Sequence, residues 1–510
     1  MCPDHRKPKA RLSVFFLLTW AFLFSSSLSF AQYNYSQVCQ KAYQEILNLH
    51  FKEARRLITQ EKSADPGNLI PAYLENYIDY LTLFLGEDHK QYEQFKPGFM
   101  ARLDALEKGK PSSPYYNFCL GESNLQWAFV QVKFGDYTKA ALRVRKANQY
   151  FTENSKRFPE FIPNNIGLGI THFLAGLVPD SYRWIASLLG FTGSVSEGLK
   201  ELKAVAAYSG SDPVYNQFKP QAVLYLAMVS VNLGKDKTEA LKVVDMFAGG
   251  NTVQSPLIIF AVSNIMMKNG MNERALRLLT QRPRDAASFP FYFLDLMEGN
   301  ARMNSLDTLS LTNYYYFLTH FKGEHYVKSA WQKVGWMRFI TGDTLGYRQA
   351  MIKLLGIGNT EVEEDKQAER EAELKQLPNL VMLRARVLFD GGYYERAEGE
   401  FLNRPSQSYL FNRKDLVEYP YRMGRIYHEW GKSDKALGYY RLAIQRGKND
   451  QWYFAAAAAL QMGLIYENKG EYARADSAYH VCLECKPADY KNSLSQKAKA
   501  GISRVKAGRR

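Results

Sequence analysis

The sequence has few cysteines and few signals for β-strands. Five cysteines occur in 510 residues, which is too sparse for a scaffold held together by disulfides. No Asn-Gly or Asp-Gly hairpin turn lies between alternating segments, and Asp390-Gly391-Gly392 stands between two helical patterns. Stability must therefore come from packing, for which the 46% hydrophobic and 14% aromatic content supplies ample bulk.

Motifs that would mark an enzyme or a bound cofactor are also missing. The chain has no Gly-x-x-x-x-Gly-Lys-Ser/Thr phosphate loop, no Gly-x-Ser-x-Gly elbow and no His-Glu-x-x-His zinc motif. Gly167-Leu168-Gly169 lacks the preceding strand of a dinucleotide fingerprint. His172 lies in an apolar helix, where a hydrogen-bonded core residue is expected. We therefore expect no catalytic residue, no cofactor and no metal.

Cys482-x-x-Cys485 has a spacing that redox and metal sites use. It lies late in a predicted helix, whereas thiols of redox motifs are activated at a helix N-terminus. Together with His480 it offers three ligands, but structural zinc sites use four. We expect both thiols to pack in the core, with a local or intermolecular disulfide as the alternative.

Residues 1–31 have the organisation of a secretory signal peptide. An apolar stretch covers Leu12–Phe24, and small residues follow, with Ser29 and Ala31 at the −3 and −1 positions. The apolar stretch is shorter than the roughly 20 residues of a spanning helix, so an uncleaved anchor is only the alternative. Basic character precedes the stretch, at His5, Arg6, Lys7, Lys9 and Arg11.

The net charge of +15 is dispersed, because no run of five or more Lys or Arg residues occurs. Dispersed charge is typical of a solvated surface. Together with the export signal, it argues against nucleic acid as a partner. We expect an exported protein of the periplasm, associated with the outer membrane or secreted.

Helical periodicity dominates the remaining chain, and near the C-terminus it repeats. The small anchors Ala385, Gly424 and Gly463 are 39 residues apart. Small residues let two helices approach closely, large residues fill the groove beside the crossing, and a turn Gly ends the first helix. The copies are Ala385, Leu388, Gly392, Ala397 and Phe401; Gly424, Tyr427, Gly431, Ala436 and Tyr440; and Gly463, Tyr466, Gly470, Ala475 and Tyr479.

These offsets resemble the tetratricopeptide repeat over residues 378–490, although the usual period is 34 residues. The resemblance implies an all-α fold, a right-handed α-α superhelix of antiparallel helix pairs. Weaker copies are anchored upstream, at Ala42, Ala54 and Pro66; Ala128, Gly135, Ala140 and Ala147; Ala227, Gly234 and Ala240; Ser263, Gly270 and Ala275; and Trp331, Gly335 and Gly342.

Residues 164–204 do not follow the repeat pattern and are rich in Gly and apolar residues. They resemble a signature of the eukaryotic tetratricopeptide-repeat family linked to inclusion-body clearance and lipid-droplet contacts. Ser194 and Val195 depart from it, since that family tends to have Asp-Arg there. The resemblance supports an all-helical architecture. The matching positions are Gly169, Leu177, Pro179, Leu188, Gly190, Phe191, Gly193, Gly198, Leu199 and Leu202.

The charged segment 360–377 is predicted to be a helical spacer that is exposed on one face. The expected organisation is a signal peptide at 1–31, N-terminal repeats at 32–163, a Gly-rich helical insert at 164–215, degenerate repeats at 216–359, the spacer, and C-terminal repeats at 378–510.

The first helix of each repeat lines the concave groove of such a superhelix. Arg386 and Arg425 hold the same offset in adjacent copies, so we expect their guanidiniums to line one wall and to pair with carboxylates of a peptide. The alternative is that groove residues only solvate or brace neighbouring helices. The candidates are Asn379, Met382, Arg386, Phe389, Tyr421, Arg425, His428, Leu460, Leu464 and Glu467.

These observations favour a non-catalytic, protein-binding scaffold of the cell envelope, whose partner is a protein or peptide with acidic groups and whose association with the envelope is peripheral. An exported glycan-binding protein is the alternative, because the aromatic residues could stack on sugar rings. Exported glycan binders of this kind usually carry a lipid-anchor Cys after the signal, where this chain has Gln32. A helical-repeat enzyme is a third hypothesis, for which no set of site residues can be named.

Overall fold

A computed structural model of the protein describes residues 32–177, 190–233, 241–242, 244–245 and 255–508. The predicted signal peptide lies outside these residues, as do Pro179 and Leu188 of the Gly-rich segment and Gly234 and Ala240 of one weak copy. The described elements are helices, and apart from an isolated bridge between Gln32 and Asn68 they include no strand pairing. The predicted all-α fold is confirmed.

Many of the described helices pack against the next helix in the sequence, such as α6 (Pro114–Lys133) against α7 (Tyr137–Arg157) and α23 (Arg413–Glu429) against α24 (Ser433–Gly447), which short turns join. The N-terminal part contains α2 (Gln37–Leu47), α3 (Phe51–Ala64), α4 (Ile70–Gly86), α5 (His89–Glu107), α6 (Pro114–Lys133), α7 (Tyr137–Arg157), α8 (Asn164–Leu177), α10 (Val195–Ala206), the short α11 (Pro213–Asn216) and α12 (Lys219–Leu233).

The pairing continues through the second half of the chain. It contains α14 (Pro256–Lys268), α15 (Asn272–Thr280), α16 (Phe293–Asn304), α17 (Ser310–His320), α18 (Val327–Ile340), α19 (Thr344–Leu355), α20 (Glu363–Glu373), α21 (Leu380–Asp390), α22 (Tyr394–Leu402), the short η3 (Ser406–Ser408), α23 (Arg413–Glu429), α24 (Ser433–Gly447), α25 (Phe454–Asn468), α26 (Tyr472–Glu484) and α27 (Lys491–Gly508).

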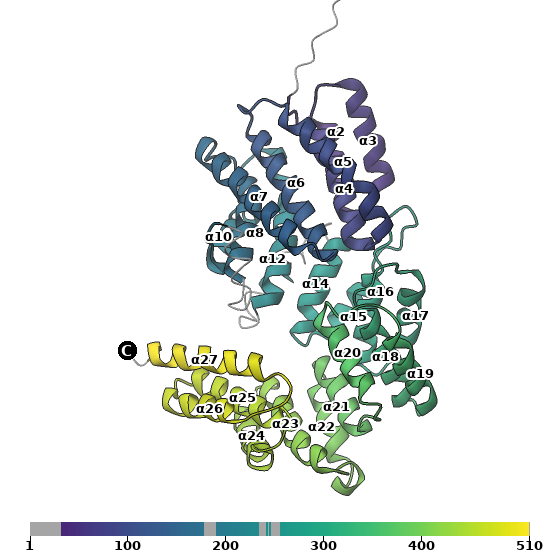
Figure 1. Ribbon diagram of the computed structural model, residues 1–510, viewed down its shortest axis with the longest axis vertical. Coiled ribbons are helices and arrows are strands. Elements are labelled where there is room, and N and C mark those ends of the chain that lie inside the picture. Colours follow the sequence, from purple (N-terminus) through teal and green to yellow (C-terminus); the bar gives the residue numbers. More distant parts are fainter. Residues whose placement is uncertain (1–31, 178–189, 234–240, 243, 246–254, 509–510) are drawn as a thin grey trace, which may run out of the picture.

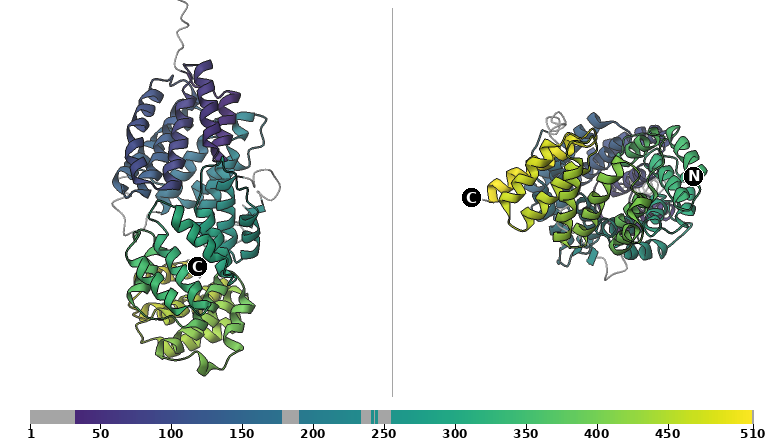
Figure 2. Two further views of the ribbon diagram at one scale, coloured as in Figure 1. Left: turned by 90° about the vertical axis from the view of Figure 1, so that its right-hand side faces the viewer. Right: turned by 90° about the horizontal axis from the view of Figure 1, so that it is seen from below.

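Together the pairs form a bent superhelix. Figure 1 shows them following one another along the long axis, from α2–α5 at one end to α21–α23 at the other. Helices α23–α27 then project to one side, so the chain resembles the letter C, and the perpendicular views show the same stacking (Figure 2). No described helix combines the length and the apolar character that crossing a bilayer requires.

The helix crossings explain why the C-terminal copies repeat. A Cβ atom added to Gly424 would lie 2.5 Å from the ring of Tyr440, and one added to Gly463 would lie 2.3 Å from the ring of Tyr479. The small anchor and the large residue predicted to fill the groove are therefore in direct contact. The turn glycines of the copies have positive φ angles, at Gly392, Gly431 and Gly470, and so do those of weaker copies, at Gly135, Gly270 and Gly342.

Two hydrophobic cores run through the superhelix. The first extends from Tyr35 to Val387, and the second from Val381 to Val505. Helix α21 belongs to both, because Leu383 faces the first core while Leu388 faces the second. It is the junction between the two parts of the molecule.

The charged segment after α19 forms α20, which packs against α18. Asp365 is fully buried and accepts hydrogen bonds from the backbone N–H groups of Tyr326 and Ser329 (2.7 Å for the latter), at the start of α18. Trp336 Nε1 donates to Glu371 at 2.7 Å. One face of α20 thus stabilises α18, and Glu373 lies on its exposed face.

Candidate functional site: a row of cations on the C-terminal repeats

Four basic side chains project from the first helices of successive pairs. Lys333 comes from α18, Arg386 from α21, and Arg422 and Arg425 from α23. We call these four residues the cation row. All four side chains are half-buried, because they lie on the faces that the stacked pairs turn toward one another.

Two of the arginines rest on aromatic rings of the preceding pair. The guanidinium carbon of Arg386 lies 4.8 Å from the centre of the Trp336 ring, and that of Arg425 lies 5.1 Å from the Phe389 ring. A cation over an aromatic face is attracted by the ring quadrupole. This contact restrains the position of each guanidinium.

The cation row is only partly neutralised by its own chain. Arg422 pairs with Glu418, and Arg425 lies 3.6 Å from Glu429. Within the described residues, no carboxylate lies within 4.0 Å of Arg386 or Lys333, and Lys333 Nζ donates to Ser329 Oγ at 2.6 Å. Arg386 and Lys333 therefore lack a carboxylate in direct contact, although the charge of Asp390 acts on all four cations.

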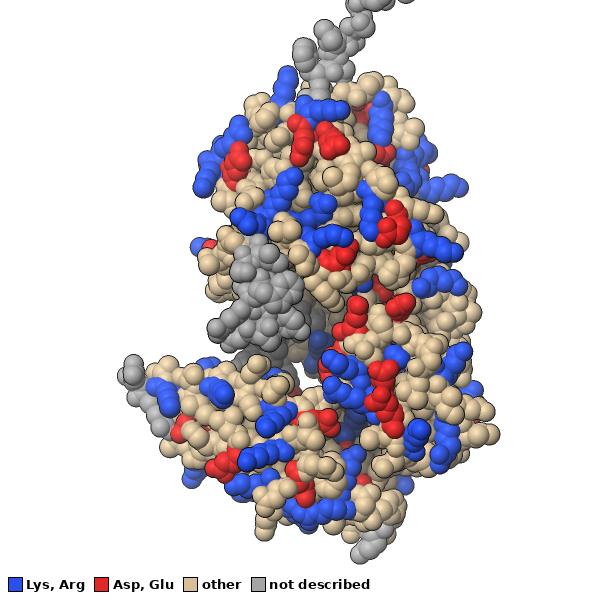
Figure 3. All heavy atoms as spheres, in the orientation of Figure 1, with Lys and Arg blue, Asp and Glu red and all other residues tan. Residues whose placement is uncertain are grey.

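The surroundings of the row are recessed. Burial lowers the pKa of Lys333 below its ordinary value. Asp390 has solvent-exposed surface, yet the protein around it raises the pKa of its carboxyl group, while Arg386, Arg422 and Arg425 act in the opposite direction. Charges in such a setting interact more strongly than they would in open water. Figure 3 shows the molecular face hollowed between the C-terminal helices and the rest, with Lys and Arg atoms around the hollow.

The structure brings three of the ten sequence-derived candidates together in the cation row and its aromatic supports: Arg386, Phe389 and Arg425. Three others, Met382, Tyr421 and Leu460, are at most 7% exposed and belong to the second core. They hold helices together and present little surface to a partner.

The other candidates have local roles. Asn379 caps α21, because its Oδ1 accepts from the backbone N–H of Val381 at 3.1 Å. Glu467 accepts from Arg504 of α27 at 2.6 Å, which ties α25 to the last helix. His428 packs edge-on against the ring of Tyr440, and Leu464 is half-buried. Their participation in a groove stays a prediction.

Sequence reasoning missed Lys333, Trp336, Asp390 and Arg422. A signal for Trp336 was present, since it follows Gly335 as Arg386 follows Ala385 and Arg425 follows Gly424. Helix α20 lies between the copies anchored at Gly335 and Ala385, so these two anchors are not 39 residues apart. The shared offset of Trp336 and Arg386 was therefore not recognised. Lys333 and Arg422 lie at a repeat offset where the other copies have different residue types, so the repeat alignment gave no signal for them.

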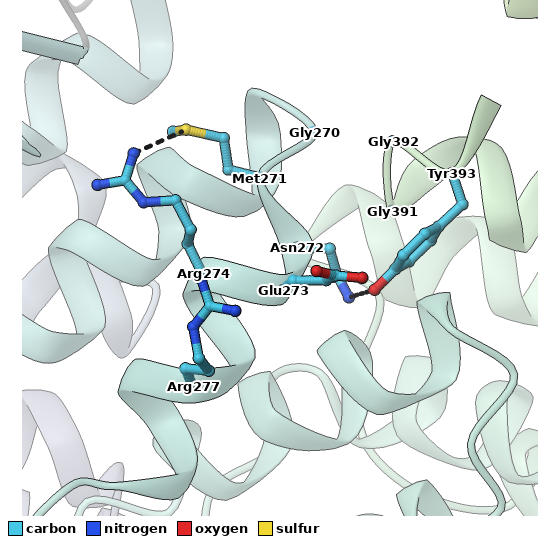
Figure 4. Close-up of a pocket in the computed structure, with 9 residues that line it drawn as sticks. All are labelled: Gly270, Met271, Asn272, Glu273, Arg274, Arg277, Gly391, Gly392 and Tyr393. Atoms are coloured by element: carbon cyan, nitrogen blue, oxygen red, sulfur yellow. Dashed lines mark hydrogen bonds between the residues drawn. The ribbon is translucent and has the colours of Figure 1, made fainter. Parts of the chain in front are cut away.

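A second concave feature lies where two turns meet. Gly270, before α15, and Gly392, before α22, touch so closely that a Cβ on Gly392 would lie 2.3 Å from the Gly270 carbonyl oxygen. Asn272 and Tyr393 point toward each other across this contact, at 3.2 Å (Figure 4). The adjoining pocket of 340 Å³ also includes the exposed Arg274 and Arg277. The Gly270–Gly392 contact packs the turn before α15 against the turn before α22.

The paired cysteines lie in the second core. Cys482 and Cys485 are buried free thiols, 2% and 6% exposed. Burial raises the pKa of Cys482 to about 12, so its reactive thiolate form is scarce near neutral pH. This placement agrees with the expectation of core packing.

Comparisons with known proteins bear mainly on the repeats. No curated protein matches the chain in sequence. A solved structure titled "Structure of Naa15/Naa10 bound to HypK-THB" is similar over 92% of this chain and 78% of that chain, with 12% identity and a TM-score of 0.20, which supports no conclusion about function. The tetratricopeptide-repeat profile matches residues 418–448, in α23 and α24. This segment thus resembles that repeat in both sequence and helix pairing.

Proposed function

We propose that this protein is a protein-binding scaffold and that its cation row holds the carboxylates of an acidic peptide segment. Helical repeats of this type offer an extended surface on which a peptide can lie. The observation that carries the proposal is the position of Arg386, which is stacked on Trp336 and has no carboxylate partner within 4.0 Å in the described part of the chain.

The geometry favours carboxylates over other ligands. A planar guanidinium presents two parallel N–H groups that fit both oxygens of a carboxylate. Arg386 and Arg425 repeat this arrangement on adjacent pairs, so side chains along an extended peptide would meet them in turn. Sugar stacking is less well supported here, because guanidiniums cover the Trp336 and Phe389 rings.

The proposal also covers the compartment in which the protein acts. The signal-like residues 1–31 support export to the cell envelope. There the protein would act without catalysis, by holding a partner protein along its repeats.

The test compares binding of a fluorescent hexaglutamate peptide to the wild type and to an Arg386→Gln/Arg425→Gln double variant, measured by anisotropy at low salt. Each charge-assisted hydrogen bond contributes roughly 1.5–3 kcal/mol, so we expect the double variant to bind at least about 10-fold more weakly. Glutamine keeps a polar side chain of similar length and limits damage to packing.

Arg348→Gln is the matched control, since Arg348 is exposed on α19, a helix that carries no member of the cation row, and should leave binding unchanged. A hexalysine peptide should not bind either protein. Equal affinity of the wild type and the double variant for hexaglutamate would place acidic-peptide binding elsewhere and refute the role of the cation row.

A further inference from the structure

The Gly-rich segment that the proposed function does not use brings two helices unusually close. A Cβ atom on Gly198 of α10 would lie 2.4 Å from the carbonyl oxygen of Gly169 on α8, and one on Gly169 would lie 2.9 Å from the carbonyl oxygen of Gly198. The two helices can cross this closely only because both positions are glycine. The side chains one turn further along each helix are therefore forced to meet.

Those side chains are metal-ligand types. His172 of α8 lies beside Glu201 of α10, with Nδ1 2.9 Å from the nearer carboxylate oxygen. Glu197, one turn earlier on α10, places an oxygen 4.0 Å from the same nitrogen. One donor atom from each of the three residues lies within 4.8 Å of the other two.

His172 pairs closely with Glu201, at 2.9 Å, whereas Glu197 reaches the same nitrogen only at 4.0 Å. Like charges four residues apart on a helix repel each other. Within the described residues, no Lys or Arg lies within 4.0 Å of either carboxylate to relieve this repulsion. Glu201 and Glu197 raise the pKa of His172, and its protonated ring supplies one positive charge for the two carboxylates. A divalent cation seated between the carboxylates and the imidazole would neutralise both.

The spacing fits a small divalent ion. Ligands about 2.0–2.1 Å from a tetrahedral ion lie about 3.3 Å apart. The two separations from the His172 nitrogen, 2.9 Å and 4.0 Å, lie on either side of this value, and all three donor atoms are within 4.8 Å of one another. One imidazole and two carboxylates suit zinc among the common divalent metals. The Glu197 side chain is 53% exposed, so the site is open to solvent for entry and for a water ligand.

We propose that His172, Glu197 and Glu201 bind a divalent transition-metal ion, with zinc as the best-fitting choice. The ion would join α8 to α10 at the glycine crossing. This inference is independent of the cation row, which lies on α18, α21 and α23.

The test uses the full-length protein after treatment with a chelator. Zinc binding is measured by isothermal titration calorimetry, and cobalt binding by visible absorption, which reports inner-sphere coordination. The wild type is expected to bind one zinc ion at this site and to melt at a higher temperature with zinc. Glu197→Gln should weaken binding at least about 10-fold.

Glu197→Gln is a conservative choice because Ser194 caps α10, with its Oγ accepting from the Glu197 N–H at 3.2 Å, and Gln serves as well as Glu at this position of a capping box. Helix α10 should therefore stay intact. His480→Gln is the control, since His480 lies 3.8 Å from a single carboxylate, that of Asp476, and should bind zinc as the wild type does.

Absence of saturable zinc binding by the wild type would overturn the proposal. So would a Glu197→Gln variant that binds zinc as tightly as the wild type, because the ion would then be held elsewhere.

Discussion

Glu122 on α6 is a carboxyl group that the first core leaves without exposed surface. One of its oxygens accepts from Gln221 Nε2 at 2.9 Å, and the other has no hydrogen-bond partner within the described residues. Burial raises the pKa of Glu122 from 4.5 to about 7. The core therefore favours the protonated, neutral form of Glu122, and ionisation of its carboxyl group destabilises the folded state.

The sign of the pH dependence follows from the raised pKa. The stabilising contribution is fully present below the unfolded value of 4.5 and is lost as the pH rises through about 7. We expect Glu122→Gln to remove this loss, so the variant gains up to about 3 kcal/mol over the wild type between pH 5 and pH 8. Denaturant unfolding across this range measures the effect.

Glu153→Gln is the control for this measurement, since Glu153 is 60% exposed on α7 and should leave the pH profile unchanged. Parallel profiles for the wild type and Glu122→Gln would show that folding does not raise the pKa of Glu122.

At the scale of helix pairs, the close contact between Gly424 of α23 and Tyr440 of α24 leads to a testable prediction. Gly424→Ala would push a methyl group into the Tyr440 ring, at 2.5 Å, and overpacking of this kind costs about 1–3 kcal/mol. Gly438→Ala is the matched control, because no atom lies within 4 Å of its added Cβ and Ala favours a helix by up to about 1 kcal/mol.

Calorimetric melting should therefore show opposite shifts for the two variants, a lower melting temperature for Gly424→Ala and a higher one for Gly438→Ala. Equal shifts would mean that the Gly424 crossing is not tight.

The pairs also show what could be predicted from the sequence. Small anchors, turn glycines and large partners act over one or two helical turns, so the spacing of Gly424 and Tyr440 predicts their contact. The packing of α20 against α18 could not be found in this way, because Asp365 binds backbone groups that carry no sequence signal. Likewise Lys333 joins the cation row only through the path of the superhelix.

For the whole molecule, the second core predicts a fragment that folds on its own. Residues from Val381 to Val505 supply all of this core's buried members, so the fragment 378–510 should be helical and melt cooperatively. A shorter fragment starting at 391 lacks Met382, Ala385 and Leu388 and should melt at a lower temperature. Circular dichroism measures both, and an unfolded 378–510 fragment would contradict the independence of this core.

The junction at α21 has a mechanical consequence. Trp336, beside Lys333 on α18, belongs to the first core, whereas Ile426, beside Arg425 on α23, belongs to the second. An acidic peptide bound along the cation row would therefore contact helices on both sides of the junction at α21. A bound peptide would stabilise the bent arrangement of the two parts. A force that straightens the bend would in turn weaken peptide binding.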